Sequence, residues 1–145
     1  MGSDMQYKAS LTDIFIYLMI SYNIGQMRRL TYNEIIEINK QIGEGGVTQN
    51  SNLEFIMDKA KDINDPIKYA ATLLFEITRA HSFTNGNKRT AFYAFAEFLE
   101  LNDYALREEP GFNDKIARML NDIAEGKAEQ DKVKRLVENL TEKKG

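Results

Sequence analysis

Hydrophobic residues recur along most of this chain at helical spacing, and few stretches alternate apolar and polar residues as a half-buried strand does. Short polar or glycine-containing segments separate the apolar stretches. The pattern therefore predicts an all-α domain. The predicted helices span approximately residues 12–22, 31–42, 53–60, 67–80, 88–101, 113–124 and 129–140.

Two helix starts carry specific signals. Thr31 and Glu34 have capping-box spacing, in which each side chain accepts a hydrogen bond from the other residue's backbone N–H. Asp65 precedes Pro66, and aspartate caps a helix while proline fits its first position. We expect helices to begin at both places.

Two segments of the predicted helices, residues 67–80 and 91–101, are apolar on almost every face, which is typical of helices in the middle of a bundle. The polar loop 81–90 joins them. Phe83 is the exception in this loop, and we expect it to anchor the loop to the core. A polar loop between two buried helices is the first place to look for chemistry.

Length and composition limit the possibilities. The 145 residues suit one domain, and the absence of cysteine excludes disulfides, thiolate zinc sites and cysteine nucleophiles. A single histidine excludes multi-histidine metal sites. The formal net charge of −3 favours neither nucleic acid nor an acidic membrane as a partner. A cysteine-free chain is compatible with a reducing compartment, and we expect a cytoplasmic protein.

Residues 1–29 are expected to be an addition to the main domain, 30–145. Met1 to Met5 look like an expression scar, followed by a helix. Its apolar stretch, residues 14–20, is far shorter than the roughly 20 residues that span a membrane. We expect this helix to pack on the domain, with a homodimer surface as the alternative.

The start of the helix after the polar loop has an unusual charge pattern. Gly86 can adopt backbone angles that other residues avoid, and Asn87 is a good N-cap. Lys88 and Arg89 then place two cations where the helix dipole ordinarily favours carboxylates. An anion at this turn would resolve the conflict, and a phosphate is the natural one.

His81 lies at the other end of the same loop. Its imidazole could take a proton from a hydroxyl near neutral pH, so the loop could combine a base with an anion cradle. That combination suits transfer of a phosphoryl or nucleotidyl group to a hydroxyl. The alternative is structural: a polar loop histidine, a common Asn-Gly turn pair and a solvated Lys-Arg pair.

The ten residues His81-Ser82-Phe83-Thr84-Asn85-Gly86-Asn87-Lys88-Arg89-Thr90 resemble the HxFx(D/E)(G/A)N(G/K)R signature of the Fic/Doc family. The Asn-Lys-Arg-Thr run resembles the Doc branch. The resemblance implies a Fic-type helical bundle with a short flap or hairpin, acting on ATP with Mg²⁺ and on a protein substrate.

The resemblance also implies roles for individual residues. His81 would be the general base, and Arg89 would hold nucleotide phosphates. Gly86, Asn87 and Lys88 would form the anion-binding turn. The flap that aligns the target backbone would consist of Gly45, Gly46, Val47 and Thr48.

Three departures from the family pattern bear on which reaction the protein catalyses. Fic adenylyltransferases have glycine in place of Lys88 and a second arginine in place of Phe92, so both residues favour a Doc-like kinase. Its target could be translation elongation factor Tu, and adenylylation (AMPylation) is the alternative. Asn85 replaces the acidic residue that orients magnesium, which makes it a weak metal ligand. A catalytically weak Fic-fold binding protein is therefore a further alternative.

Many Fic proteins carry an inhibitory [Ser/Thr]-x-x-x-Glu-[Gly/Asn] motif. The only spacing match here is Thr72 to Glu76, which is followed by Ile77 inside a predicted core helix. We therefore expect control by a separate antitoxin protein.

Overall fold

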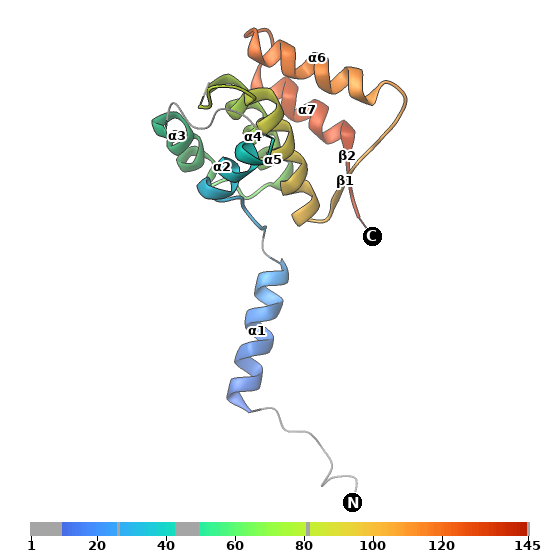
Figure 1. Cartoon of the computed structure of the whole chain (residues 1–145). Helices are drawn as coiled ribbons and strands as arrows, with labels where there is room; N and C mark the ends of the chain where they lie inside the picture. The colour runs from blue at the N-terminus through green and yellow to red at the C-terminus, as the bar shows by residue number, and fades with distance from the viewer. Residues whose placement is uncertain (1–9, 26, 43–49, 81, 145) are drawn as a thin grey trace, which may run out of the picture.

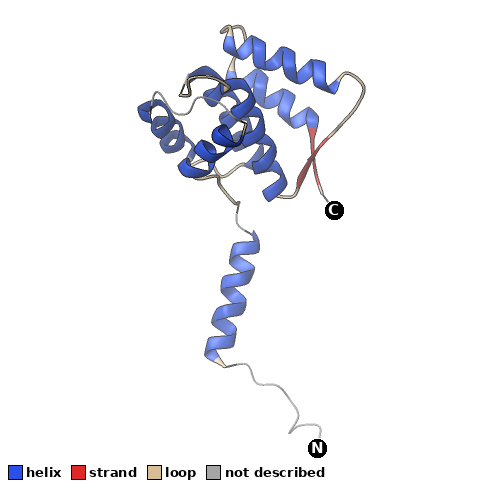
Figure 2. Ribbon diagram, viewed as in Figure 1, coloured by secondary structure: helices blue, strands red, loops and turns tan. Residues whose placement is uncertain are grey.

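The structure is a computed structural model that describes residues 10–25, 27–42, 50–80 and 82–144. Helices account for most of this part of the chain, so the predicted all-α, Fic-type bundle is confirmed (Figures 1 and 2). The helices are α1 (Leu11–Gly25), α2 (Tyr32–Gln41), α3 (Asn50–Ala60), α4 (Pro66–Ala80), α5 (Asn87–Leu101), α6 (Phe112–Ala124) and α7 (Gln130–Leu140).

Helix α4 forms the centre of the bundle and packs against α3, α5, α6 and α7 (Figure 1). Its buried residues cover most of its circumference, as the nearly uniform apolar pattern predicts. In the interface between α4 and α5, the Tyr69 and Phe98 rings lie 4.5 Å apart. Burial raises the pKa of the Tyr69 hydroxyl above its usual value. These two central helices set the positions of both ends of the loop between them.

Side-chain caps fix the starts of α2 and α4. Thr31 accepts a bond from the Glu34 amide, and the Glu34 side chain accepts one from the Thr31 amide, so the predicted capping box is confirmed. Asp65 accepts a bond from the Ile67 amide at 3.0 Å, with Pro66 as the first residue of α4. Both sequence signals therefore mark true helix starts.

A small antiparallel sheet, absent from the sequence-based expectations for this part of the chain, connects the end of α5 to the C-terminal segment. Strand β1 (Tyr104–Leu106) pairs with β2 (Thr141–Lys143), with Tyr104 opposite Lys143. Each strand has three residues, too few to show an alternating pattern. The pairing joins segments distant in sequence, so it depends on the packing of α7 against α4.

Helix α1 does not show the packing on the domain that we expected. It extends away from the bundle in Figure 1, and its described apolar side chains are exposed, including Phe15 at 64% and Tyr17 at 69%. The main body begins close to Arg28, whose backbone N–H and C=O both bond the Asn102 side chain. The apolar pattern alone therefore did not predict where this helix lies. No helix in the described residues is long and apolar enough to cross a membrane.

Candidate functional site

The candidate site is the turn between α4 and the N-terminus of α5. Gly86 has φ of 75°, in the left-handed region that glycine tolerates, and it occupies the N-cap position. The prediction of Asn87 as N-cap is wrong, because Asn87 is already the first helical residue. Its side chain instead holds the loop, accepting from the Phe83 N–H at 3.1 Å and donating to the Phe83 C=O at 3.0 Å.

The first half of the loop is tied into the core. Phe83 is only 2% exposed, which confirms its predicted role as an apolar anchor. The Asn52 side chain on α3 donates to the C=O of Ala80, the last residue of α4, at 2.7 Å. The Ser82 side chain is also buried, and its hydroxyl has no hydrogen-bond partner among the described residues. The burial of Phe83 and the hydrogen bond from Asn52 therefore fix the first half of the loop.

Asn39 on α2 holds the second half of the loop, a role that sequence reasoning missed. Its fully buried side-chain amide donates to the Asn85 C=O at 3.2 Å and to the Thr90 hydroxyl at 3.0 Å. The signal in the sequence is an asparagine within the apolar stripe of Ile35 and Ile38. A buried amide requires partners, and here the partners are the turn and the first helical turn of α5.

A pocket of about 290 Å³ opens at this turn. It is lined by residues 85–89, by Thr78 and Thr84, and by Ala124 at the end of α6. The structure thus brings the predicted residues Asn85 to Arg89 together around one hollow. Phe92 does not line the pocket, and its ring packs 6.1 Å from that of Phe95. His81 and the flap residues Gly45 to Thr48 lie outside the described residues.

The pocket rim carries positive charge from α5. No described side chain caps the α5 N-terminus, and its first turn contains no acidic residue. The Lys88 ammonium donates to the Asn121 side chain of α6 at 2.7 Å, a contact that sequence reasoning also missed. The pKa of the Glu125 carboxyl lies below its usual value, chiefly because it bonds Lys127 and in smaller part because Lys88 is close. Lys88 is therefore held between two helices at the edge of the pocket.

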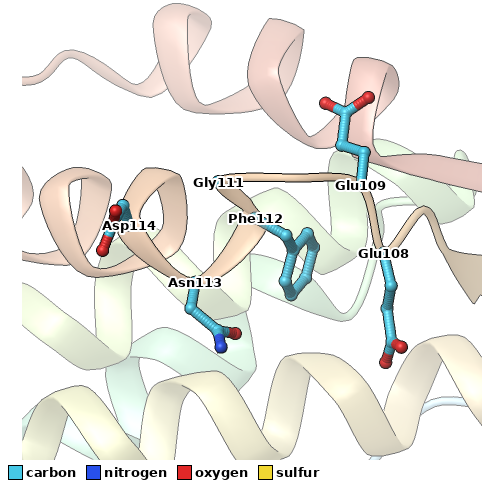
Figure 3. A pocket seen from close by; sticks show the side chains of 6 residues that line it. All are labelled: Glu108, Glu109, Gly111, Phe112, Asn113 and Asp114. Carbon is cyan, nitrogen blue, oxygen red and sulfur yellow. The ribbon is translucent and has the colours of Figure 1, made fainter.

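A second, larger hollow of about 480 Å³ lies where the chain enters α6. Figure 3 shows Glu108 and Glu109 pointing to opposite sides of the backbone, with Asp114 on the neighbouring turn. Glu109 is already paired with Lys115 at 2.8 Å. Within the described part of the chain, no group of three acidic or histidine residues could hold a metal ion. This hollow therefore lacks the convergent groups of a metal site.

Comparison with known proteins agrees with the fold and the loop. A family model described as Fic/DOC family matches residues 29–99, which include α2, α3, α4, most of α5 and the whole turn. A search of curated proteins found no match to the chain. The matched region begins close to Arg28, where the main body begins, and ends within α5. Over residues 29–99 the chain is therefore similar to the Fic/Doc family, and its helical fold agrees with that similarity.

Proposed function

We propose that this protein transfers the γ-phosphoryl group of ATP to a hydroxyl group on a protein, in the manner of a Doc-like kinase. The single observation that carries the proposal is the uncapped N-terminus of α5, where Lys88 and Arg89 border a pocket. The family match supports transfer chemistry of the adenylylation or phosphorylation type. The choice of phosphorylation rests on the residues of the turn.

The α5 N-terminus suits an anion. Free backbone N–H groups and the helix dipole create positive potential there, and two cations in the first turn increase it. A phosphate would accept hydrogen bonds from the amides and from the Arg89 guanidinium. The pocket, about 290 Å³, lies just below the range of roughly 300–1,000 Å³ that is typical of ligand sites. It would therefore hold the phosphates of a nucleotide, with the nucleoside extending beyond it.

Lys88 and Phe92 favour a kinase over an adenylyltransferase. The Lys88 side chain occupies the pocket edge where adenylylating relatives have glycine, and this would crowd an α-phosphate. Phe92 packs on the core and supplies no charge for a second phosphate contact. Adenylylation of a protein hydroxyl is the alternative within the same family.

In the proposed reaction, His81 takes the proton from the target hydroxyl. The hydroxyl oxygen attacks the γ-phosphorus, the bond from that phosphorus to the β,γ-bridging oxygen breaks, and ADP leaves with the electron pair. Arg89 and the α5 amides neutralise charge on the phosphates. The flap, residues 45–48, would align the target backbone, as the family resemblance implies.

Magnesium fits the described residues poorly. The pocket lining contains no carboxylate, and Asn85 offers only a neutral amide oxygen. Mg²⁺ prefers carboxylates and substrate phosphates and usually retains several waters. We propose that the ion enters with ATP and that Asn85 is at most one of its ligands, so none of the steps above is assigned to the metal.

Labelled ATP tests the proposed reaction. Purified protein is incubated with a bacterial lysate, or with translation elongation factor Tu, and either γ-³²P-ATP or α-³²P-ATP. We expect γ-label on a protein band with the wild type and none with His81→Ala or Arg89→Ala. Transfer of the α-label would establish the adenylyltransferase alternative. Absence of both labels would refute the transfer proposal.

Asn85 motivates a third possibility, a Fic-fold protein that binds a nucleotide or partner with little turnover. The variant Asn85→Asp restores a carboxylate at the pocket. The kinase proposal expects measurable wild-type transfer that changes with this substitution by less than about tenfold. A wild type with no transfer, activated only by Asn85→Asp, would support the binding protein.

We also propose that a separate antitoxin controls the activity. The only spacing match to the inhibitory motif lies in the core helix α4, where Glu76 pairs with Lys59 at 2.7 Å. The Thr72 hydroxyl is likewise occupied, by Lys68 and Gln130. Induced expression is expected to arrest bacterial growth, and His81→Ala is expected to relieve the arrest. Arrest that persists in His81→Ala would contradict toxicity through transfer.

A further inference from the structure

Helices α6 and α7 leave a groove between them on the outside of the bundle. The two helices run side by side in Figure 1, and each packs more closely on α4 than on the other. The hollow between them, of about 510 Å³, is larger than the pocket at the α5 turn. Its apolar lining comes from Met119 of α6, from Val133 and Leu136 of α7, and from Ala128 between the two helices. We call this hollow the α6–α7 groove.

Positive charge surrounds the apolar lining of the groove. Lys115 and Arg118 border it on α6, and Lys132 and Arg135 border it on α7. Asp122 is the only acidic residue in the lining. The chain as a whole has a net charge of −3, so the groove is positively charged although the protein is negatively charged overall.

Most of these cations lack an internal counterion. Lys115 pairs with Glu109 at 2.8 Å. Arg118, Lys132 and Arg135 form no ion pair with any residue that the structure describes. Their charges are therefore available to a bound partner.

An apolar lining surrounded by cations favours a ligand that has both apolar side chains and negative charge. A free phosphate would gain little from an apolar lining, whereas an amphipathic helix buries apolar side chains in such a groove. Acidic residues flanking those apolar side chains would face the four cations. The chain's own exposed helix α1 has Asp13 as its only charged residue, so a second copy would leave most of the cations unpaired.

We propose that the α6–α7 groove docks an acidic amphipathic helix of a partner protein. Such a helix would lie across α6 and α7 as a third packed helix, with aliphatic side chains on the apolar lining. The proposal concerns binding alone and does not rest on the transfer reaction. Helix α6 also contributes Asn121 and Ala124 to the candidate site, so a helix bound in the groove would lie against an element of that site.

Three stapled peptides of about 15 residues test the proposal with the full-length protein. All carry leucine at helical spacing, and they differ only in flanking glutamate, glutamine or lysine. Binding is followed by fluorescence anisotropy, and the contact surface is mapped by NMR shifts of the Met119 and Leu136 methyl groups. We expect the glutamate peptide to bind at least tenfold more tightly than either other peptide, and to weaken when NaCl rises from about 0.05 to 0.5 M.

A charge-matched pair of double variants locates the site. Arg118→Glu with Arg135→Glu reverses two groove cations, and we expect it to weaken the glutamate peptide by at least about tenfold. Lys61→Glu with Lys134→Glu makes the same change in net charge outside the groove lining, and we expect less than a twofold effect. All four residues are surface cations, and their variants are checked for an unchanged thermal midpoint.

Several results would overturn the proposal. Equal binding of the glutamine peptide would mean that charge does not select the ligand. Equal losses in both double variants, or methyl shifts outside the groove, would place the site elsewhere. No binding of the glutamate peptide at about 1 mM would exclude the site itself. Self-association that the groove variant abolishes would make a second copy the occupant.

Discussion

Three asparagine side chains, each buried or bridging two segments, hold the candidate turn in place. Asn39 bonds the turn from α2, Asn87 bonds the preceding loop at Phe83 from the start of α5, and Asn121 holds Lys88 from α6. An asparagine side chain offers both donors and an acceptor, so it can satisfy a backbone segment that has no regular partner. The shape of the turn therefore depends on three side chains from three different elements.

Removing the Asn39 amide is expected to destabilise the protein. Asn39→Ala would leave the Asn85 C=O and the Thr90 hydroxyl without this donor in a buried setting, at a cost of about 1–3 kcal/mol. Urea denaturation measures the change in the free energy of unfolding. Asn33→Ala, at an exposed position on the same helix, is the control and should change it by less than about 0.5 kcal/mol. Equal effects of both substitutions would contradict the role of Asn39.

Releasing Lys88 is expected to weaken nucleotide binding. Asn121→Ala removes the acceptor 2.7 Å from the ammonium, so the lysine would have to be ordered when phosphate binds. We expect the dissociation constant for ATP to rise about threefold, or about 0.6 kcal/mol, by isothermal titration calorimetry. Asn113→Ala, exposed on the same helix, should leave it unchanged. Tighter binding in Asn121→Ala would mean that Asn121 restrains Lys88 away from the ligand.

Among the secondary-structure elements, the N-termini of α2 and α5 differ in how their backbone amides are satisfied. The α2 start is fully capped by Thr31 and Glu34. The α5 start has a left-handed glycine, no side-chain cap from the described residues and two cations. Capping a helix satisfies its amides internally, whereas leaving it open makes the amides available to a ligand. Helices α6 and α7 also begin without a side-chain cap, but each has an aspartate in its first turn, Asp114 and Asp131. The argument for an anion at α5 is therefore that its uncapped start carries two cations and no carboxylate.

Loss of the α2 cap is expected to cost stability. Thr31→Ala removes the acceptor of the Glu34 amide, and N-cap substitutions of this kind cost about 1 kcal/mol. The free energy of unfolding from urea denaturation measures this cost. Thr31→Ser keeps the hydroxyl and should retain most of the stability. A serine variant as unstable as the alanine variant would show that the threonine methyl group matters instead.

The whole molecule consists of a main body, which is a bundle around α4, and the described part of α1, which lies apart from that body (Figure 1). The buried core cluster runs from Leu30 to Leu140 and contains none of the α1 side chains that the structure describes, residues 11–19. The Asn102 side chain fixes the backbone at Arg28, just before that core begins. The stability of the body should therefore be independent of α1.

Deleting residues 1–26 tests this independence. We expect the free energy of unfolding to change by less than about 0.5 kcal/mol, because no core contact is lost. Urea denaturation with both near-ultraviolet and far-ultraviolet circular dichroism provides the measurement. A substantially lower midpoint in the shortened chain would show that α1 packs on the body in solution.

Local rules in the sequence determined the helical architecture. Periodicity predicted the helices, and Thr31, Asp65 and Gly86 acted as their residue types predict, because caps and turns depend on neighbours within a few positions. The candidate turn, residues 85–89, was also predicted, because its charge pattern conflicts with a helix start. Phe83 was predicted as an anchor because it is apolar within a polar loop.

Long-range packing decided the rest. The contacts of Asn39 with Asn85, of Lys88 with Asn121, and of β1 with β2 join residues far apart in the chain, and no local pattern encodes such pairs. The same apolar pattern can lie in a core or remain exposed, so only the tertiary structure placed the described side chains of α1 outside the core. The sequence by itself thus determined the helices and which residue types the turn contains, because both follow from neighbours within a few positions, whereas the tertiary structure decided which residues support that turn and which described surfaces remain uncovered.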